Sequence, residues 1–247
     1  MGDRIMFDFQ PKGKSWNERA KLTGLNSVLD PNDISNKNFF IDTIHKKAIK
    51  QFINRYSNGK FNKCLDFGCG IGRLADFLSQ FSNTYIGIDV TDEMISKARK
   101  NNKETNRNFL VYNGLNIPEE NNSVDFICSV LVLQHINNQE EFDYLSIEIG
   151  RVLKKRGILL FIEQTTKEKN EKYYIDAFVK NGFKLVKIKN IRYGRSISSW
   201  LISRIKNDNK LADFFVKVCC FINQIEILFN PIILETYKET IFCLERK

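Results

Sequence analysis

The stretch 63–81, KCLDFGCGIGRLADFLSQF, constrains the fold more than any other part of the 247-residue chain. It opens with a short apolar run, 63–67, which is typical of a buried strand in a parallel sheet. Glycines follow at alternate positions: Gly68, Gly70 and Gly72. Apolar residues then recur at helical spacing: Leu74, Phe77, Leu78 and Phe81. The pattern predicts a strand, a glycine turn and a helix, an arrangement in which bare backbone and a helix N-terminus approach a ligand closely.

The next segment, NTYIGIDV at 83–90, reads as a second strand that ends near Asp89. Asp89 stands 17 residues after Gly72, close to the distance of about 20 residues at which an acid meets ribose hydroxyls in nucleotide-binding folds. A second acid, Asp66, precedes the first glycine. Asp66 would repel a pyrophosphate but suits the ammonium group of an amino acid. This acid argues against a dinucleotide, and NADH stays as a minor alternative.

The pattern Asp66-x-Gly68-x-Gly70-x-Gly72 resembles the first motif of the class I S-adenosylmethionine-dependent methyltransferases, and Asp89 matches their ribose-binding acid. The resemblance is specific over residues 63–164. It implies an α/β fold with a doubly wound, mostly parallel, seven-stranded Rossmann-like sheet whose last strand is antiparallel. An N-terminal helical lid and a helical insertion before the last strand complete the expected architecture. The implied cofactor is S-adenosylmethionine, with S-adenosylhomocysteine as its product.

The resemblance also implies which residues contact the cofactor. Arg19, on the N-terminal segment, is expected to grip the methionine carboxylate in a bidentate manner. Met94 is expected either to touch the adenine or to pack in the core. Asn113 stands where many family members carry an Asp that binds the adenine amino group, and its side-chain carbonyl can still accept that hydrogen bond. The full predicted set is Arg19, Asp66, Gly68, Cys69, Gly70, Gly72, Asp89, Val90, Met94, Asn113, Gly114, Leu115, Val130 and Gln134.

Segment 123–135, SVDFICSVLVLQH, resembles the next family motif, an aspartate and an apolar strand followed by a loop that ends in a histidine. The fourth strand lies beside the first in this fold, so its carboxyl end borders the reactive methyl group. His135 is the predicted general base for a hydroxyl acceptor, and a loop histidine that only packs is the alternative. Gln134 is expected to orient substrate or cofactor. Glu163 is a second candidate for the pocket rim or a solvent-facing carboxylate, and His45 is expected to be structural.

Composition narrows the class of protein. Hydrophobic residues make up 43% of the chain, and no apolar signal sequence or membrane-spanning run is visible, so we expect one soluble cytoplasmic domain with appendages. The six cysteines lack zinc-ligand spacing, which predicts reduced thiols and no metal site. The net charge of +9 suits nucleic acid, an anionic membrane or a phosphorylated substrate, or reflects compositional bias. No RNA-binding signature or zinc knuckle supports nucleic acid.

We expect four parts along the chain: an N-terminal lid and helix (1–58), a cofactor-binding core (59–191), a helical insertion (192–237) and a final core strand (238–247). The insertion begins basic and is strongly apolar over 211–234. Two helices that cover the substrate pocket or form a dimer contact are the leading interpretation, in a monomer or homodimer. An interfacial helix on an anionic membrane is the rival, because such a helix needs a basic flank beside aromatic and aliphatic residues.

The residues and the resemblance together predict an S-adenosylmethionine-dependent methyltransferase that acts on a small molecule. The expected reaction is O-methylation of a phosphorylated, nucleotide-linked or lipid-linked sugar, as in bacterial surface polysaccharide biosynthesis. The basic charge is the reason for choosing such an acceptor. N-methylation of a small amine is an alternative, and a silent cofactor-binding scaffold subunit is the alternative outside enzymes. We expect no nucleic-acid partner.

Overall fold

The computed structural model describes residues 15–57, 59–206, 211–229 and 237–247. Parts of two predicted segments lie outside the described residues: 1–14 and 58 of the expected lid and helix, and 207–210 and 230–236 of the expected insertion.

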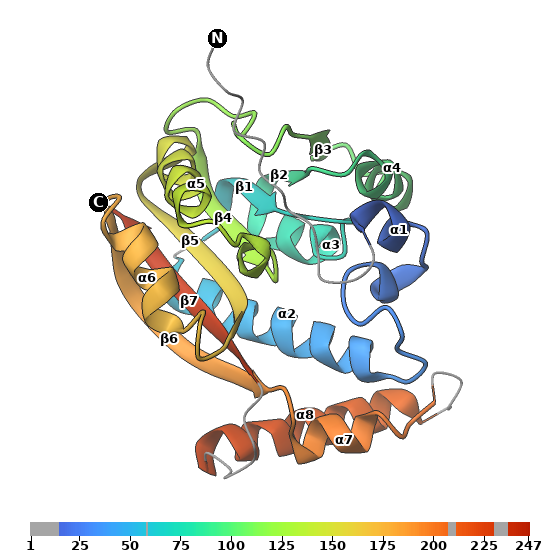
Figure 1. Ribbon diagram of the computed structural model, residues 1–247. Coiled ribbons are helices and arrows are strands. Elements are labelled where there is room, and N and C mark those ends of the chain that lie inside the picture. The colour runs from blue at the N-terminus through green and yellow to red at the C-terminus, as the bar shows by residue number, and fades with distance from the viewer. Residues whose placement is uncertain (1–14, 58, 207–210, 230–236) are drawn as a thin grey trace.

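The strands in the described part of the chain form one seven-stranded sheet in the order β3-β2-β1-β4-β5-β7-β6 (Figure 1). They are β1 (Phe61–Phe67), β2 (Ser82–Asp89), β3 (Arg107–Val111), β4 (Val124–Val130), β5 (Leu153–Thr165), β6 (Phe183–Tyr193) and β7 (Lys238–Arg246). β1 pairs in parallel with β2 and β4, whereas β7 runs antiparallel between β5 and β6. The predicted Rossmann-like sheet with an antiparallel last strand is therefore confirmed, as is the place of the fourth strand beside the first.

Helices cover both faces of this sheet (Figure 1). The helical elements are α1 (Trp16–Ala20), η1 (Gly24–Ser27), α2 (Lys37–Tyr56), α3 (Ala75–Leu78), η2 (Ser79–Phe81), α4 (Asp92–Asn101), η3 (Leu133–His135), α5 (Gln139–Val152), α6 (Glu171–Val179), α7 (Ile197–Ile202) and α8 (Ala212–Phe229). One core cluster joins the sheet to α2, α3 and α4, and the other joins it to α5 and α6. Because β1 and β4 are covered on both faces, they read in the sequence as continuous apolar runs.

α5 illustrates how local sequence builds these layers. The side chain of Asn138 caps the helix by accepting a hydrogen bond from the backbone N–H of Glu140, a contact typically worth about 1 kcal/mol. The helix then buries Phe142, Leu145 and Ile149, which follow one another at intervals of three and four residues and form one stripe. The stripe faces the sheet, so the helix and the strands complete a common core.

The helix after the glycine turn is shorter than the sequence predicted. Apolar spacing predicted a helix up to Phe81, but α3 covers a single turn and the 3₁₀ turn η2 follows it. β2 begins at Ser82, directly after η2, which leaves no length for a longer α-helix. The prediction of a helix N-terminus aimed at the ligand is therefore wrong, and the bare backbone of the turn itself forms the site.

The segment between β6 and β7 forms α7 and α8, which pack against each other and against α2. β6 runs on to Tyr193, so the first two residues of the expected insertion belong to the strand. The amide of Asn36, just before α2, donates hydrogen bonds to the carbonyls of Ile205 and Lys206 at 3.0 and 2.8 Å. These bonds attach the residues after α7 to the start of α2.

Candidate functional site

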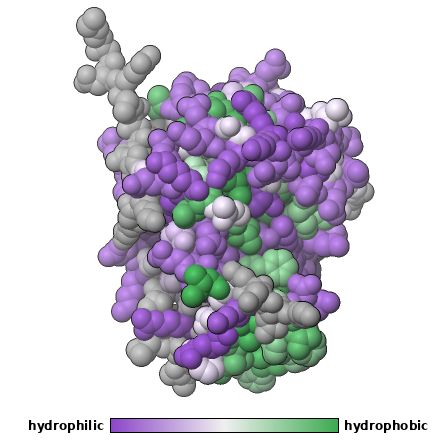
Figure 2. Space-filling model, turned by 90° about the vertical axis from the view of Figure 1, so that its right-hand side faces the viewer, coloured by the Kyte–Doolittle hydropathy of each residue, from purple (hydrophilic) through white to green (hydrophobic). Residues whose placement is uncertain are grey.

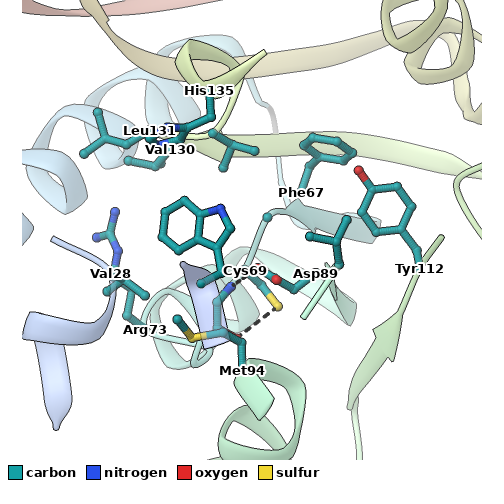
Figure 3. A pocket seen from close by; sticks show the side chains of 15 residues that line it. Val28, Phe67, Cys69, Arg73, Asp89, Met94, Tyr112, Val130, Leu131 and His135 are labelled. Carbon is teal, nitrogen blue, oxygen red and sulfur yellow. Dashed lines mark hydrogen bonds between the residues drawn. The ribbon is translucent and has the colours of Figure 1, made fainter. Parts of the chain in front are cut away.

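A cavity of about 660 Å³ lies at the carboxyl ends of β1, β2 and β4, where open α/β sheets bind ligands at the switch point of strand order. Its walls are formed by Trp16, Val28, Phe67, Gly68, Cys69, Gly70, Arg73, Asp89, Val90, Met94, Tyr112, Val130, Leu131, Val132 and His135. Figure 3 shows Leu131 and His135 on one side of the cavity and Asp89 and Met94 on the other. The glycine turn and the exit of the fourth strand, which are distant in sequence, thus meet at one site.

The glycine turn approaches two side chains that leave no room for a β-carbon. Gly68, Gly70 and Gly72 have φ angles of +72°, +53° and +75°, values that side-chain-bearing residues rarely adopt. A β-carbon on Gly68 would lie 2.4 Å from a methyl group of Val132, and one on Gly70 would lie 2.7 Å from a methyl group of Val28. Both the backbone conformation and the close approach therefore require glycine at Gly68 and Gly70.

Asp89 ends β2 and is held by the backbone on two sides. Its Oδ2 accepts the N–H of Gly70 at 3.0 Å and its Oδ1 accepts the N–H of Thr91 at 3.0 Å. Burial raises the pKa of Asp89, while the backbone N–H groups of Thr91 and Gly70 favour its ionised form. The Thr91 side chain and the backbone of Val90 also favour the ionised carboxylate, and Asp89 lies on the cavity wall, where hydroxyls of a ligand could contact it.

Asp66, the acid of the glycine motif, is buried beside Tyr85 and is not among the described residues that line this cavity. It is 2% exposed, and its Oδ2 accepts a hydrogen bond from the hydroxyl of Tyr85 at 2.7 Å. Burial raises the pKa of Asp66 to about 6, against the opposing effects of Tyr85 and Arg73. The predicted contact between Asp66 and the ammonium group of the cofactor stays a prediction, because Asp66 is not among the described residues that form the cavity wall.

The structure gathers about half of the other predicted cofactor residues at the cavity. Those on its wall are Gly68, Cys69, Gly70, Asp89, Val90, Met94 and Val130. Predicted residues outside the described wall are Gly72, Asn113, Gly114 and Leu115. Asn113 is exposed, and its side-chain carbonyl accepts the backbone N–H groups of Leu115 and Asn116 at 3.0 Å each. That acceptor is therefore engaged in a local turn, and its predicted contact with adenine remains untested.

Sequence reasoning missed several wall residues. Phe67 ends β1 and Tyr112 directly follows β3, so both lie at the carboxyl ends of strands. The predicted strand boundaries could have indicated these two residues. Arg73 follows the glycine turn directly, and its position one residue past Gly72 was an available signal. The others are Trp16, which lies on α1, and Val28, Leu131 and Val132, which lie on loops; tertiary packing brings all four to the cavity.

A second cavity, of about 760 Å³, shares part of its wall with the first. The shared residues are Trp16, Val28, Leu131 and His135. The remaining wall is mostly polar: Arg19, Leu29, Asp30, Pro31, Lys37, Ile41, Gln134, Gln164, Arg192, Tyr237 and Glu239. Arg19 and Gln134, which were predicted to contact the cofactor, lie here. Within the described chain neither α7 nor α8 lines either cavity, so the expected role of these helices as a pocket cover is not supported.

His135 lies between the two cavities. Its ring meets the indole of Trp16 edge-on, with centroids 5.1 Å apart, and its Nε2 lies 3.4 Å from the Nε2 of Gln134. The side-chain oxygen of Gln134 accepts the backbone N–H of Gln164, so the side-chain NH₂ group of Gln134 faces His135. His135 Nε2 is therefore the acceptor of a hydrogen bond from this group. Burial, with the charges of Arg19 and Lys169, lowers the pKa of His135 to about 4. His135 is therefore neutral near pH 7, with its unprotonated nitrogen at Nε2.

Glu163 is neither at the rim nor in solvent, which corrects both sequence-based alternatives. It is fully buried, and its carboxylate accepts the backbone N–H groups of Val132, Leu133 and Gln134 at 2.9–3.1 Å. Burial raises the pKa of Glu163 to about 8, and the three N–H groups oppose that effect. Glu163 is thus a positioning residue that holds the loop on which Gln134 and His135 lie.

A buried polar network connects the two cavities. Arg73, on the first, pairs with Asp42 at 2.6 Å and lies 3.4 Å from Nδ1 of His45. Because Arg73 can only donate, His45 Nδ1 accepts and His45 Nε2 carries the hydrogen that is donated to Glu239 at 3.0 Å. Glu239 in turn forms an ion pair with Arg192, on the second cavity. His45 is fully buried at the centre of this network, and its burial lowers its pKa.

Comparison with known proteins adds the family. Residues 65–161 match a family model described as a methyltransferase domain. This span contains the glycine turn, Asp89 and the loop of His135, and the sheet has the strand order and antiparallel last strand described above. Residues 65–161 of this chain form a methyltransferase domain. The resemblance found in the glycine motif is therefore confirmed.

Relatives of this methyltransferase domain differ in what they methylate. The chain is 27% identical over 170 residues to a 23S rRNA (uracil(1939)-C(5))-methyltransferase of Francisella tularensis, which covers 62% of this chain and 36% of that protein. It is 29% identical over 141 residues to a ubiquinone biosynthesis O-methyltransferase of Pelagibacter ubique, which covers 55% of each chain. The chain thus spans about a third to a half of the length of the curated relatives it matches.

The fold likeness extends further than the sequence likeness. An S-adenosylmethionine-dependent methyltransferase of Leishmania major superposes with a TM-score of 0.65 at 14% identity, covering 96% of this chain and 86% of that one. At this identity the likeness concerns the fold alone. The fold likeness therefore extends beyond residues 65–161, which the family model matches.

Proposed function

We propose that this protein transfers a methyl group from S-adenosylmethionine to a hydroxyl of a small polar acceptor, with the cofactor in the first cavity and the acceptor in the second. The observation that carries this proposal is the joint wall of the two cavities, where His135 lies between Asp89 with its bare glycine turn and a polar chamber. Methyl transfer requires this adjacency, because most of the rate comes from holding donor and acceptor in line and excluding water.

The residues of the first cavity fit S-adenosylmethionine. Asp89 on the cavity wall is placed to accept hydroxyls of a ribose, and Gly68 and Gly70 bring bare backbone to the same wall. Val90 and Met94 supply apolar surface for a base beside Asp89. When bound, the cofactor supplies an electrophilic methyl group on a sulfonium. The chain's task is then to orient this group toward the second cavity.

His135 is the group placed to take the acceptor's proton. Its unprotonated Nε2 is oriented by Gln134, and Glu163 fixes the loop that holds both. The low pKa keeps His135 neutral, as a base must be before transfer, but also makes it a weaker base than a free imidazole. Nε2 has a single lone pair, so the Gln134 amide must release it when the acceptor hydroxyl binds, and Nε2 can then take the proton of that hydroxyl. Positioning contributes more to the rate than basicity does.

The second cavity favours a phosphorylated, nucleotide-linked or lipid-linked sugar as the acceptor. Gln164 and Tyr237 on its wall offer hydrogen-bonding groups of the kind that bind sugar hydroxyls. The Nε of Arg19 is buried and has no hydrogen-bond partner among the described residues. Burial also lowers the pKa of Arg19, a sign that its charge is incompletely compensated. An anionic group of the acceptor at Arg19 would supply the missing partner.

Calorimetric titration with S-adenosylmethionine and S-adenosylhomocysteine tests the cofactor assignment. Asp89→Ala removes the carboxylate, and one charge-assisted hydrogen bond from it to a ribose hydroxyl is worth about 1.5–3 kcal/mol, so we expect affinity to fall by about tenfold to a hundredfold. Asp176→Ala is the matched control, because Asp176 is exposed on α6, pairs with Lys172 at the surface and lines neither cavity.

Three outcomes of this titration would end the proposal: no binding of either compound, binding of NADH instead, or equal loss in both variants. Turnover is then measured with phosphorylated and nucleotide-linked sugars. An Arg19→Gln variant should raise KM for a phosphorylated acceptor and leave cofactor affinity unchanged. If it weakened cofactor binding instead, Arg19 would hold the methionine carboxylate as the sequence predicted.

A further inference from the structure

α8 has two apolar faces, and only one of them is used inside the protein. The buried side chains Val216, Cys219, Cys220 and Asn223 follow helical spacing and pack toward α2 and β6. On the opposite side lies the surface that we call the apolar face, formed by Phe214, Val218, Phe221, Ile225, Leu228 and Phe229. At about 100° per residue these six side chains fall within about 100° of the helix circumference. They form one continuous stripe along the helix.

The apolar face is strongly exposed. Phe214 and Phe221 are 60% and 63% exposed, and Leu228 and Phe229 are each 79% exposed. Figure 2 shows hydrophobic side chains gathered at the bottom of the molecule, where Figure 1 places α7 and α8. Trp200 of α7 adds a further side chain that is 57% exposed. Single exposed apolar residues are ordinary, but a contiguous stripe of this kind marks an interaction surface.

The charges around the apolar face are mostly basic. Exposed basic residues of the described insertion are Arg195, Arg204, Lys206 and Lys217. Among the described residues of the insertion, Asp213 is the exposed acid, because Glu226 is buried and accepts hydrogen bonds from Ile197 and Ser198. The guanidinium of Arg204 lies over the Trp200 ring, 5.0 Å from its centroid. An apolar stripe with a basic border fits a negatively charged surface.

A groove of about 810 Å³ continues from the apolar face between α8, α2 and β6, and Leu228 belongs to both. Lys47 and Lys189 line this groove, are exposed, and have no carboxylate partner in the described part of the chain. At its base Asn223 is 3% exposed, and its Oδ1 lacks a hydrogen-bond donor among the described residues. Two ammonium groups above apolar walls suit a phosphate bearing acyl chains, and the Asn223 carbonyl suits a hydroxyl of its headgroup.

We propose that the apolar face of α8 docks onto an anionic lipid surface, with Lys47 and Lys189 binding a lipid phosphate in the adjoining groove. The apolar side chains would enter the interface between headgroups and acyl chains, and the basic border would face the headgroups. A second copy of the chain is the less suitable occupant, because a symmetric dimer through this face would bring two basic borders together. In the described ranges no helix has the length and hydropathy to cross a membrane, so the contact is peripheral.

Co-sedimentation with vesicles tests this docking independently of any methyl transfer. We expect binding to phosphatidylcholine vesicles that contain phosphatidylglycerol, weak binding to pure phosphatidylcholine, and release as salt is raised. The double variant Lys47→Gln/Lys189→Gln should lower the vesicle partition coefficient about thirtyfold, at roughly fivefold for each lysine. Phe221→Glu should lower this partition coefficient at least about tenfold, because it removes an aromatic ring that would enter the membrane interface and adds a charge that the anionic lipids repel.

Ile147→Glu is the matched control, since Ile147 of α5 is 57% exposed and lies on another part of the molecule. It should leave vesicle binding unchanged, and circular dichroism should show that all variants are folded. The proposal is refuted if the native protein binds neither kind of vesicle, or if binding does not depend on anionic lipid and salt. It is also refuted if Ile147→Glu weakens binding as much as Phe221→Glu does. The native protein could instead fail to bind vesicles and form a dimer in analytical ultracentrifugation. If Phe221→Glu abolished that dimer, a second copy of the chain would be the occupant of the apolar face.

Discussion

Glu239→Gln should destabilise this protein more than the loss of any surface ion pair. Glu239 lies fully buried on β7, where its carboxylate accepts hydrogen bonds from Arg192 Nε and His45 Nε2 at 3.0 Å each. Burial acts to raise the pKa of Glu239, but Arg192 and His45 hold it well below its ordinary value. Neutralising Glu239 would leave the equally buried Arg192 as a charge without a counterion.

The expected magnitude follows from this geometry. Removing one partner of a buried ion pair typically costs about 3–5 kcal/mol, because the remaining charge stays desolvated. In a chain of this size that loss corresponds to a fall in Tm of about 10 °C. Replacing both partners, as in Arg192→Met/Glu239→Gln, should cost less than the sum of the two single changes, with a coupling of about 2 kcal/mol or more.

Urea unfolding followed by circular dichroism measures these free energies. Glu171→Gln is the matched control. Glu171 of α6 pairs at 2.7 Å with Lys238, which lies on β7 as Glu239 does, but both side chains of this pair are about a third exposed. Exposed pairs contribute at most about 1 kcal/mol. The reasoning fails if Glu239→Gln costs no more than this control, or if the two single losses add fully in the double variant. Acid should also remove this stabilisation, because below about pH 4 the unfolded chain binds a proton at Glu239 while the folded carboxylate, with its depressed pKa, stays ionised to lower pH.

Two further predictions concern the site. Burial lowers the pKa of His135 to about 4, so between pH 7 and pH 4 the unfolded chain binds a proton at His135 that the folded chain does not. Over this range the free energy of unfolding of the native protein should therefore fall by about 3 kcal/mol more than that of His135→Gln. Equal falls for the two proteins in urea unfolding would contradict this. Gly70→Ala should weaken calorimetric cofactor affinity at least about tenfold, because its β-carbon meets Val28. Gly24→Ala is the control, because Gly24 has a φ of +52°, close to the +53° of Gly70, but a β-carbon there would meet no atom within 4 Å. A similar loss of cofactor affinity in the two variants would refute the steric argument.

Much of the fold could be predicted because its signals are local. The run before Gly68 and the alternate glycines encode a strand and a turn that few other conformations satisfy, and Asp89 follows at the distance that a parallel neighbour strand imposes. The family resemblance then supplied the strand order and the antiparallel last strand, which hydrophobic patterns alone do not contain. The length of α3 was missed, because it depends on where β2 begins and not on helical periodicity.

Side-chain direction at the site was beyond reach of the sequence. Asp66 and Asp89 both end or nearly end strands, and the register of β1 and β2 places them on the same face of the sheet. Asp66 is nevertheless buried against Tyr85, whereas Asp89, two residues further along β2 than the partner of Asp66, lies on the cavity wall. Glu163 looked like a rim carboxylate, but the loop after β4 folds over it and donates three N–H groups. Arg19 was assigned to the cofactor, and the path of the N-terminal segment places it on the second cavity.

The sequence by itself determined the doubly wound core, the glycine turn and the acid at the end of the second strand, because each depends on backbone conformation and strand spacing encoded within a few residues. Only the tertiary structure decided that His135 joins two cavities, that His45 links Arg73 to Glu239, and that the second apolar face of α8 stays uncovered. The physical reason is that these features depend on which distant segments pack together, and burial, partners and exposure are properties of that packing.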